Sequence, residues 1–245
     1  MNNGTGNSIT VRRYSGNDTD AWNGFVRTSR NGTFLHNRGY MDYHADRFAD
    51  HSLMFYADEE LIAIMPAHVK ENSLCSHNGL TYGGLLLSDH TTTETVLAIF
   101  DALKEYLLNN GIATRIIYRP VPHIYHSYPC EEDIYALFRN GALLTECKAS
   151  SVIELDNPIP FKGRRRLTVA MKSRLHIKEQ KDYTAFWEIL GDRLKSRYGT
   201  SPVHTLEEIE LLHERFPDNI RLFTVNDNDG NILGGTVLYV TDRVV

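Results

Sequence analysis

The chain has 245 residues, of which 42% are hydrophobic and 23% are charged, and this composition excludes a globally disordered chain. Its formal net charge of −5 excludes a general electrostatic attraction to DNA, RNA or an anionic membrane, so any site for a polyanion must be a local patch. The length exceeds one average domain and falls short of two large ones.

Neither an export signal nor a membrane span is recognisable in the sequence. The first ten residues lack a basic and an apolar region, and the longest apolar run, residues 61–67, contains Pro66 and is too short to cross a bilayer. The three cysteines are odd in number and lack C-x-x-C spacing, which favours a reducing compartment over a disulfide framework. We therefore expect a cytoplasmic protein.

The chain begins with a mixture of strands and helices. We expect a disordered leader at residues 1–8, a strand at 9–11 and a helix that Asp18 or Thr19 caps and that carries Trp22.

A β-hairpin is predicted at residues 53–69, where two apolar arms flank a polar turn at 58–60. A short helix around residues 38–43 precedes this hairpin, and strands at 74–77 and 85–87 follow it.

The strongest helix signal begins at residues 91–94, which have the pattern of a capping box, and ends at Gly111. A strand at 112–118, a helix at 131–140 and a strand at 148–155 complete the first part of the chain. This order predicts the α/β class, in which a mixed sheet is covered by helices.

The second part follows a linker with two prolines at residues 156–161. Residues 162–181 contain eight Lys or Arg and one acid, and they predict a basic helix that leads into a strand around 176–178. A helix that starts at Asp182, a helix with a second capping box, Thr205 to Glu208, and a β-hairpin complete the chain.

The hairpin at residues 219–241 repeats the plan of the first hairpin, and a helix with neighbouring Trp and Phe residues precedes each of them, Trp22 with Phe25 and Trp187 with Phe186. We infer a weak internal duplication. It divides the chain into a leader 1–8, a first domain 9–155, a linker 156–162 and the N-terminal half of a second domain at 163–245, which we expect to be truncated.

Motifs of hydrolases, P-loop proteins and zincins are missing from the sequence. His123, His126 and Cys130 have no regular zinc-ligand spacing, so we expect a polar loop there and no metal. Cys147 is interpreted as a small buried hydrophobe rather than a nucleophile.

The run Arg164, Arg165 and Arg166 is the most informative polar feature, because guanidinium groups bind phosphate bidentately and three consecutive ones cannot all be buried. A solvated helix face is the alternative to an anion site. The position of the run between the two predicted domains favours a ligand site.

Two further places are candidate substrate contacts. Gly83 and Gly84 allow a ligand or another strand to approach the backbone, although a tight turn also explains them. Arg119 ends a predicted strand, where ligands often bind in α/β sheets, although a surface ion pair is the alternative.

Several segments together resemble the Fem-type branch of the GNAT superfamily, FemAB-like bacterial enzymes with two GNAT-like domains in tandem. They are residues 31–48, 81–84, 164–175, 197–204 and the hairpin at Asn219. The resemblance implies an α/β (α+β) fold, with mixed sheets flanked by helices, and acyl or aminoacyl transfer to an amine without a covalent enzyme intermediate.

The resemblance also implies that acetyl-CoA or another acyl-CoA is the donor. A pyrophosphate loop needs glycine amides free of negative charge, whereas the corresponding residues 88–94 contain Asp89 and Glu94 and no glycine. The first domain is therefore not expected to bind coenzyme A, and we expect the donor site beyond residue 245.

The implied acceptor is a small molecule or a cell-envelope precursor with a phosphate, for which Arg164, Arg165 and Lys172 are the matching basic residues. Candidates for the general base are His36, Tyr82 and His204. Two alternatives remain open: a Fem-type peptidyltransferase that uses aminoacyl-tRNA on a cell-wall precursor, and a noncatalytic module that binds a phosphate-bearing ligand.

Overall fold

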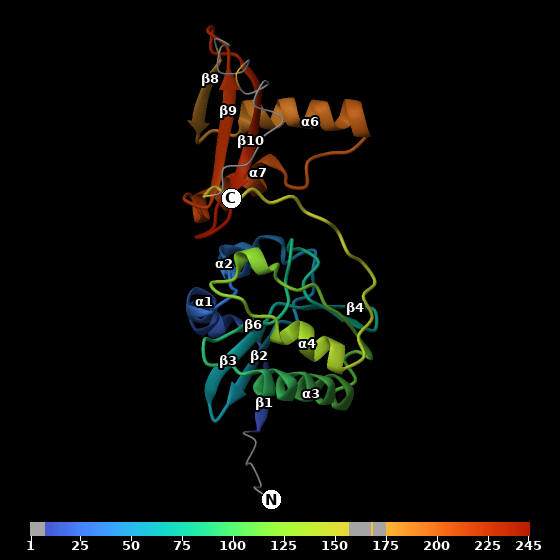
Figure 1. The fold of residues 1–245 in the computed structure, drawn as a ribbon. Coiled ribbons are helices and arrows are strands. Elements are labelled where there is room, and N and C mark those ends of the chain that lie inside the picture. The colour runs from blue at the N-terminus through green and yellow to red at the C-terminus, as the bar shows by residue number, and fades with distance from the viewer. Residues whose placement is uncertain (1–7, 157–167, 169–174) are drawn as a thin grey trace, which may run out of the picture. The chain divides into compact units, whose positions relative to one another are not determined.

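The structure is a computed structural model that describes residues 8–156, 168 and 175–245. It forms two compact units, the first made of residues 1–142 with 241–244 and the second made of residues 143–240 with 245. Each unit has its own sheets and helices (Figure 1).

The main sheet of the first unit has the order β1-β2-β3-β6 and is antiparallel throughout. Its strands are β1 (Ile9–Arg13), β2 (Leu53–Ala57), β3 (Glu60–Met65) and β6 (Leu86–Leu87). Phe55 is opposite Val11 on one side and Ala63 on the other. The predicted strand at 9–11 and the first hairpin arm are therefore confirmed.

A second sheet in this unit contains β4 (His68–Lys70), β5 (Ser73–Cys75) and β7 (Arg115–Ile117). β5 pairs antiparallel with β4 and parallel with β7. The prediction of one continuous second hairpin arm was wrong, because the chain leaves the first sheet after Met65 and enters the second at His68. Pro66 lies at this break and has no N–H for a ladder hydrogen bond.

The helices of the first unit are α1 (Thr19–Thr28), α2 (Arg38–Met41), α3 (Thr93–Asn109) and α4 (Glu132–Arg139). α3 lies along the main sheet beside α4 (Figure 1). Its apolar side chains, Val96, Ile99, Phe100, Leu103 and Leu107, join the core that contains Leu53 and Phe55. Burial of this face stabilises the unit by the hydrophobic effect.

The start of α3 differs by one residue from the predicted capping box. The Thr92 side chain is the N-cap and accepts a hydrogen bond from the Thr95 amide at 3.3 Å. Thr91 instead donates its hydroxyl proton to the Ile62 carbonyl at 3.1 Å. A tertiary hydrogen bond therefore removes Thr91 from the capping role.

The predicted strand at 148–155 was also wrong, because residues 142–154 contain no regular secondary structure. Leu143, Leu144 and Leu155 are strongly exposed. Apolar and β-branched content favours a strand only where another strand supplies hydrogen-bond partners. The predicted basic helix lies largely outside the described residues.

The second unit has one antiparallel sheet of order β10-β9-β8, formed by β8 (His176–Gln180), β9 (Ile220–Asn226) and β10 (Ile232–Tyr239). Its helices are α6 (Thr184–Tyr198) and α7 (Leu206–Arg215). The second capping box is confirmed, since Thr205 and Glu208 exchange backbone and side-chain hydrogen bonds of 3.0 and 3.2 Å.

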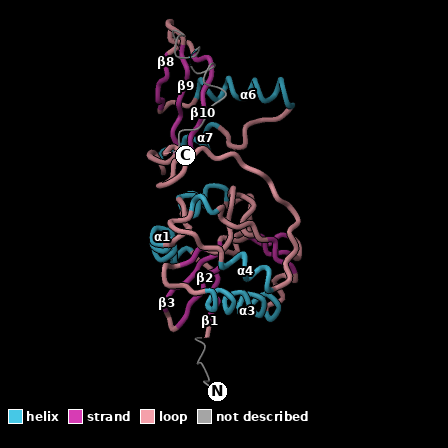
Figure 2. Tube along the Cα trace, viewed as in Figure 1, coloured by secondary structure: helices cyan, strands magenta, loops and turns pink. Residues whose placement is uncertain are grey.

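Both units follow the same plan, which supports the inferred internal duplication. A strand, two helices and a hairpin succeed one another, and the first strand pairs antiparallel with the first arm of the hairpin (Figure 2). In each unit the tryptophan of the first helix donates its indole N–H to a histidine carbonyl, Trp22 to His36 at 2.8 Å and Trp187 to His204 at 3.1 Å.

The fold is thus a mixed α+β fold with three sheets flanked by helices, as the sequence predicts. No helix within the described ranges has the length and hydropathy needed to cross a bilayer.

Candidate functional site

Five of the residues nominated from the sequence lie in the first unit: His36, Tyr82, Gly83, Gly84 and Arg119. His204 lies in the second unit. Arg164, Arg165 and Lys172 lie outside the described residues.

His36 and Tyr82 come together through a residue that the sequence did not nominate, Thr33. The Thr33 amide donates to Nδ1 of His36 at 3.1 Å, and its hydroxyl is 3.3 Å from the same nitrogen. The hydroxyl is also 3.1 Å from the phenol oxygen of Tyr82. Thr33 thus bridges two side chains that are 46 positions apart in the sequence.

Burial dominates the protonation of this cluster. His36 is fully buried, and burial lowers its pKa to about 4 because a charged imidazolium loses its hydration. Burial likewise raises the pKa of Tyr82, an effect that the Thr33 hydroxyl opposes. Both side chains are therefore neutral near pH 7.

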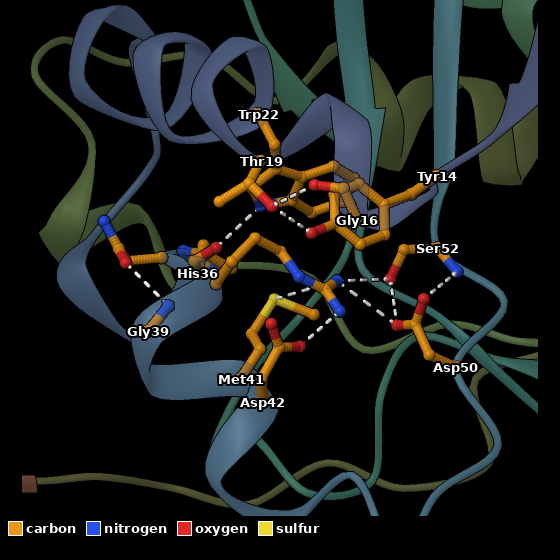
Figure 3. A network of polar contacts seen from close by, with 12 residues as sticks. Tyr14, Gly16, Thr19, Trp22, His36, Gly39, Met41, Asp42, Asp50 and Ser52 are labelled. Carbon is orange, nitrogen blue, oxygen red and sulfur yellow. Dashed lines mark hydrogen bonds and ion pairs between the residues drawn. The ribbon is translucent and has the colours of Figure 1, made fainter.

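Figure 3 shows the network of polar contacts that holds the backbone of His36 in place. Its carbonyl accepts the Trp22 indole N–H, and the buried Arg38 guanidinium lies 3.9 Å from the Tyr14 ring centre. Arg38 also forms ion pairs with the carboxylates of Asp42 and Asp50. Two carboxylates compensate the buried charge, so this network fixes α2 and the segment before β2 in place.

Gly83 and Gly84 lie where two segments of the chain approach each other closely, which leaves no room for a side chain. A Cβ at Gly83 would lie 2.3 Å from the Ser76 carbonyl oxygen, and the Gly83 amide donates to the Arg119 carbonyl at 3.2 Å. Gly84 has a φ of 78°, and a Cβ there would be 3.1 Å from the Tyr118 hydroxyl. Tyr82 is consequently fixed between two neighbouring segments.

Arg119 is exposed and lies at this same crossing of segments. Its amide donates to the Ser76 hydroxyl at 2.7 Å, and its Nη1 donates to the Leu80 carbonyl at 3.4 Å. The backbone of Arg119 therefore helps to position the Tyr82 segment, while its guanidinium remains at the surface.

Tyr125 is the second member of the site that the sequence did not nominate. It is partly exposed, its ring centre lies 4.7 Å from that of Tyr82, and its hydroxyl is a hydrogen-bonding partner of the Tyr82 side chain. The only signal in the sequence was the unusual His-Ile-Tyr-His run at 123–126, which does not indicate a contact with Tyr82.

The run that contains Tyr125 is held by a buried Cys and His pair. Cys130 Sγ is 3.1 Å from Nδ1 of His126, whose Nε2 is 3.1 Å from the Val121 carbonyl. Burial raises the pKa of Cys130 to about 11, so the sulfur stays a thiol and donates to Nδ1. Within the described ranges, no three His, Cys, Asp or Glu side chains are arranged to bind a metal.

His204 occupies in the second unit the position of His36 in the first, because both carbonyls accept an indole N–H. Its Nε2 is 3.4 Å from the hydroxyl of Tyr239. Both nominated histidines are thus adjacent to a tyrosine, but His204 is only partly buried.

The loop between β6 and α3 does not fit a coenzyme A pyrophosphate. Its hydroxyl groups are already used, with Ser88 Oγ 2.9 Å from Thr91 Oγ1 and Thr92 capping the Thr95 amide. Asp89 adds a negative charge, and an anion site at a helix start requires free amides.

The sequence matches no protein-family model and no curated protein. Among solved structures, FemX superposes with a TM-score of 0.56 at 15% sequence identity over 89% of this chain. The chain shares the fold of FemX. It spans 58% of the FemX chain.

Two further solved structures match at lower similarity. Aminoglycoside N-acetyltransferase AAC(6')-Iy has a TM-score of 0.39 at 12% identity over 61% of this chain and 97% of its own. Ribosomal-protein-alanine N-acetyltransferase from Brucella melitensis has a TM-score of 0.38 at 11% identity over 60% of this chain and 99% of its own.

Proposed function

We propose that the protein is an N-acyltransferase that transfers an acyl group from a coenzyme A thioester to an acceptor amine. The observation that carries this proposal is the FemX-like fold over 89% of the chain. We further propose that residues 9–155 and 163–245 belong to two GNAT-like domains, and that the acceptor is a small molecule or a cell-envelope precursor.

In such a transfer the amine attacks the thioester carbonyl, the C–N bond forms, the C–S bond breaks and the amine loses a proton. Catalysis requires an acceptor for this proton and a donor near the developing oxyanion. We propose that the substrate that supplies the amine contacts Tyr82, Tyr125 and Arg119 of the first unit. His36 is enclosed and its pKa is about 4, so we assign it a positioning role rather than that of the base.

The proposed activity is tested on a chain that extends beyond residue 245, where the donor site is expected, with radiolabelled acetyl-CoA and a panel of primary amines and with detection of the acetylated product. We expect product with at least one amine, and we expect Tyr82→Phe to lower kcat about 10-fold or more. Failure of this longer chain both to bind acetyl-CoA and to form product would overturn the proposal.

We also propose that Arg164, Arg165 and Lys172 bind the phosphate groups of the acceptor. Their resemblance to the basic residues of Fem-type proteins supports this, together with the affinity of guanidinium forks for phosphate. Replacement of both arginines by alanine is expected to weaken binding of UDP-N-acetylglucosamine about 10-fold or more, with little change in melting temperature. Lys181→Ala is the matched control, and unchanged binding with a lower melting temperature would favour a purely structural role.

The second candidate function is aminoacyl-tRNA-dependent transfer of the Fem type onto a cell-wall precursor, which the resemblance of the sequence to Fem-type enzymes implies. Parallel assays with acetyl-CoA and with charged tRNA separate the two donors. Binding of a phosphate-bearing ligand without transfer from either donor would instead identify a noncatalytic binding module.

A further inference from the structure

The start of α4 contains a buried carboxyl group, that of Asp133, which is 6% exposed. Its Oδ1 accepts the proton of the Ile134 amide at 2.8 Å. Its Oδ2 accepts the hydroxyl proton of Tyr118 at 2.7 Å. Both carboxylate oxygens therefore have a partner, and the start of a helix favours the negative charge.

The donor of each hydrogen bond at Tyr118 is fixed by the partners. The Leu85 amide can only donate, and it lies 2.7 Å from the Tyr118 oxygen, so this oxygen is the acceptor. The Asp133 carboxylate can only accept, so the single phenol proton of Tyr118 is donated to it.

The pKa shifts of the two side chains agree with these directions. Burial raises the pKa of Asp133, and the hydrogen bond from Tyr118 opposes this shift. Burial and the neighbouring Asp133 raise the pKa of Tyr118, whereas the Leu85 amide opposes that shift. A donor near a carboxylate or phenolate favours the ionised form, and a carboxylate beside a phenol favours the neutral phenol.

The Leu85 amide lies at the end of the segment that carries Tyr82. Between them are Gly83 and Gly84, and glycine has the widest choice of backbone conformations. The amide belongs to the peptide group that joins Gly84 to Leu85, so its hydrogen bond to Tyr118 fixes the ψ angle of Gly84. The Leu85 carbonyl is held separately by the Asn31 side chain at 2.9 Å.

The Tyr118 hydroxyl is itself held by rigid elements. The Tyr118 ring centre lies 5.9 Å from that of Phe100 on α3. Asp133 belongs to α4, which lies beside α3 (Figure 1) and contributes Ala136 to the core. Support from packed helices holds a side chain more precisely than support from a loop does.

We propose that Asp133 and Tyr118 are positioning residues for Tyr82. The carboxylate orients the Tyr118 hydroxyl, and the hydroxyl oxygen holds the Leu85 amide. The two glycines are thereby fixed in the conformation that places the Tyr82 phenol beside Thr33. This inference rests on the proposed acyl transfer for the importance of Tyr82 in the reaction, whereas the link from Asp133 to Leu85 depends on the contacts alone.

Hydrogen exchange of backbone amides, measured by NMR, tests the link. Tyr118→Phe keeps the ring and removes the hydroxyl, so the Leu85 amide should exchange about 10-fold faster or more. The amides of β2, which pairs with a strand on both sides, report the stability of the whole unit. They should change less than the Leu85 amide, because the expected opening is local.

Thr91→Val is the matched control for this experiment. It also removes a buried hydroxyl of the first unit, the one that donates to the Ile62 carbonyl. It should not accelerate exchange of the Leu85 amide relative to the amides of β2.

Two substitutions of Asp133 separate its hydrogen bond from its packing. Asn and Leu are both similar to Asp in size, but only Asn keeps an oxygen that accepts the Tyr118 proton. Asp133→Leu should therefore accelerate Leu85 exchange more than Asp133→Asn does. In protein that already has Tyr118→Phe, Asp133→Leu should add little, because both act through the same hydroxyl. Should Asp133→Leu not fold, Tyr118→Phe alone decides the link.

Tyr82 provides the measurement at the site. The carbon-13 signal of its ring should shift in Tyr118→Phe and stay unchanged in Thr91→Val. In a chain that extends beyond residue 245, Tyr118→Phe should lower kcat for acetyl transfer about 10-fold or more, with a smaller change in KM.

Unchanged Leu85 exchange in Tyr118→Phe, equal acceleration of the β2 amides, or additive effects of the two substitutions would each overturn the inference. Its failure is distinguishable from failure of the proposed function. The expected responses of Leu85 and Tyr82 in a protein without transferase activity refute only the activity, whereas transfer with an unchanged kcat in Tyr118→Phe refutes only the positioning role.

Discussion

At the scale of single residues, buried contacts decide roles that residue type alone leaves open. Gly83 was a candidate for ligand approach, and the structure places the Ser76 carbonyl where its side chain would be. His36 was a candidate base, and burial lowers its pKa to about 4. The neighbouring atoms thus explain why position 83 has a glycine and why His36 stays neutral, and neither residue needs a ligand or a catalytic role for this explanation.

The contact at Gly83 predicts the effect of adding one methyl group. Gly83→Ala should destabilise the first unit by on the order of 2 kcal/mol, because the new Cβ would overlap the Ser76 backbone. Gly191→Ala is the matched control within α6, where nothing lies within 4 Å of a new Cβ, and it should stabilise by about 0.5–1 kcal/mol. Urea denaturation measures both, and equal effects would contradict the packing argument.

Three buried histidines predict acid sensitivity of the first unit. The His77 ring centre lies 5.3 Å from that of His44 and 5.6 Å from that of His68. Burial, with repulsion from both neighbours and from Arg38, lowers the pKa of His77 to about 3, although Asp50 opposes this shift. The unfolded chain therefore binds more protons below the ordinary histidine pKa of about 6.5, and stability is lost as the pH falls from that value.

His77→Asn tests this dependence, because asparagine stays neutral and tolerates the positive φ of 47° at this position. Between about pH 7 and pH 4, the variant should lose on the order of 3 kcal/mol less stability than the parent protein. Urea midpoints across this range provide the measurement, with the exposed His90→Gln as control. Parallel curves for all three proteins would show that the cluster is not the cause.

At the scale of elements, local patterns located most helices and strands, but not the points at which tertiary contacts interrupt them. The apolar run at 61–69 divides between two sheets at Pro66, and Thr91 gives up its capping role to reach the Ile62 carbonyl. The segment 142–154 lacks a strand because no partner is aligned with it in the described structure. Such outcomes depend on neighbours that are distant in the sequence.

The hairpin between β2 and β3 offers a test at this scale. Asp58 and Glu59 both have positive φ, 47° and 67°, as in the two-residue turns that favour Asn-Gly or Asp-Gly. Glu59→Gly should therefore stabilise the first unit by about 1 kcal/mol, despite loss of the exposed ion pair with Arg12. Glu60→Gly, within β3, should destabilise the first unit. Melting temperatures that change in the same direction for both variants would contradict the turn geometry.

At the scale of the whole molecule, the two units share one order of elements: a strand, two helices and a hairpin. Each unit contains one of the two tryptophans, whose indole N–H donates to a histidine carbonyl. The fluorescence of each tryptophan therefore reports the unfolding of one unit. The cluster of buried histidines, in contrast, belongs to the first unit alone within the described residues.

Single-tryptophan variants should therefore respond differently to acid. Trp187→Phe leaves Trp22 as the reporter of the first unit, and its urea midpoint should fall between about pH 7 and pH 4. Trp22→Phe leaves Trp187 as the reporter of the second unit, and its midpoint should change less. Fluorescence-detected unfolding checks this, and a larger acid shift at Trp187 would disagree with the placement of the titrating groups.

The sequence by itself predicted most of the periodic elements, a similar plan in the two parts of the chain and a mixed sheet covered by helices, because spacing, caps and turn residues act over short distances. It also placed His36 and Tyr82 among the candidates. Only the tertiary structure brought these two together through Thr33, placed the Tyr125 ring beside Tyr82 and set their protonation, because burial and tertiary contacts arise where separate segments meet. The same physical reason determines which of the predicted strands form, since a strand is stable only when another strand pairs with it.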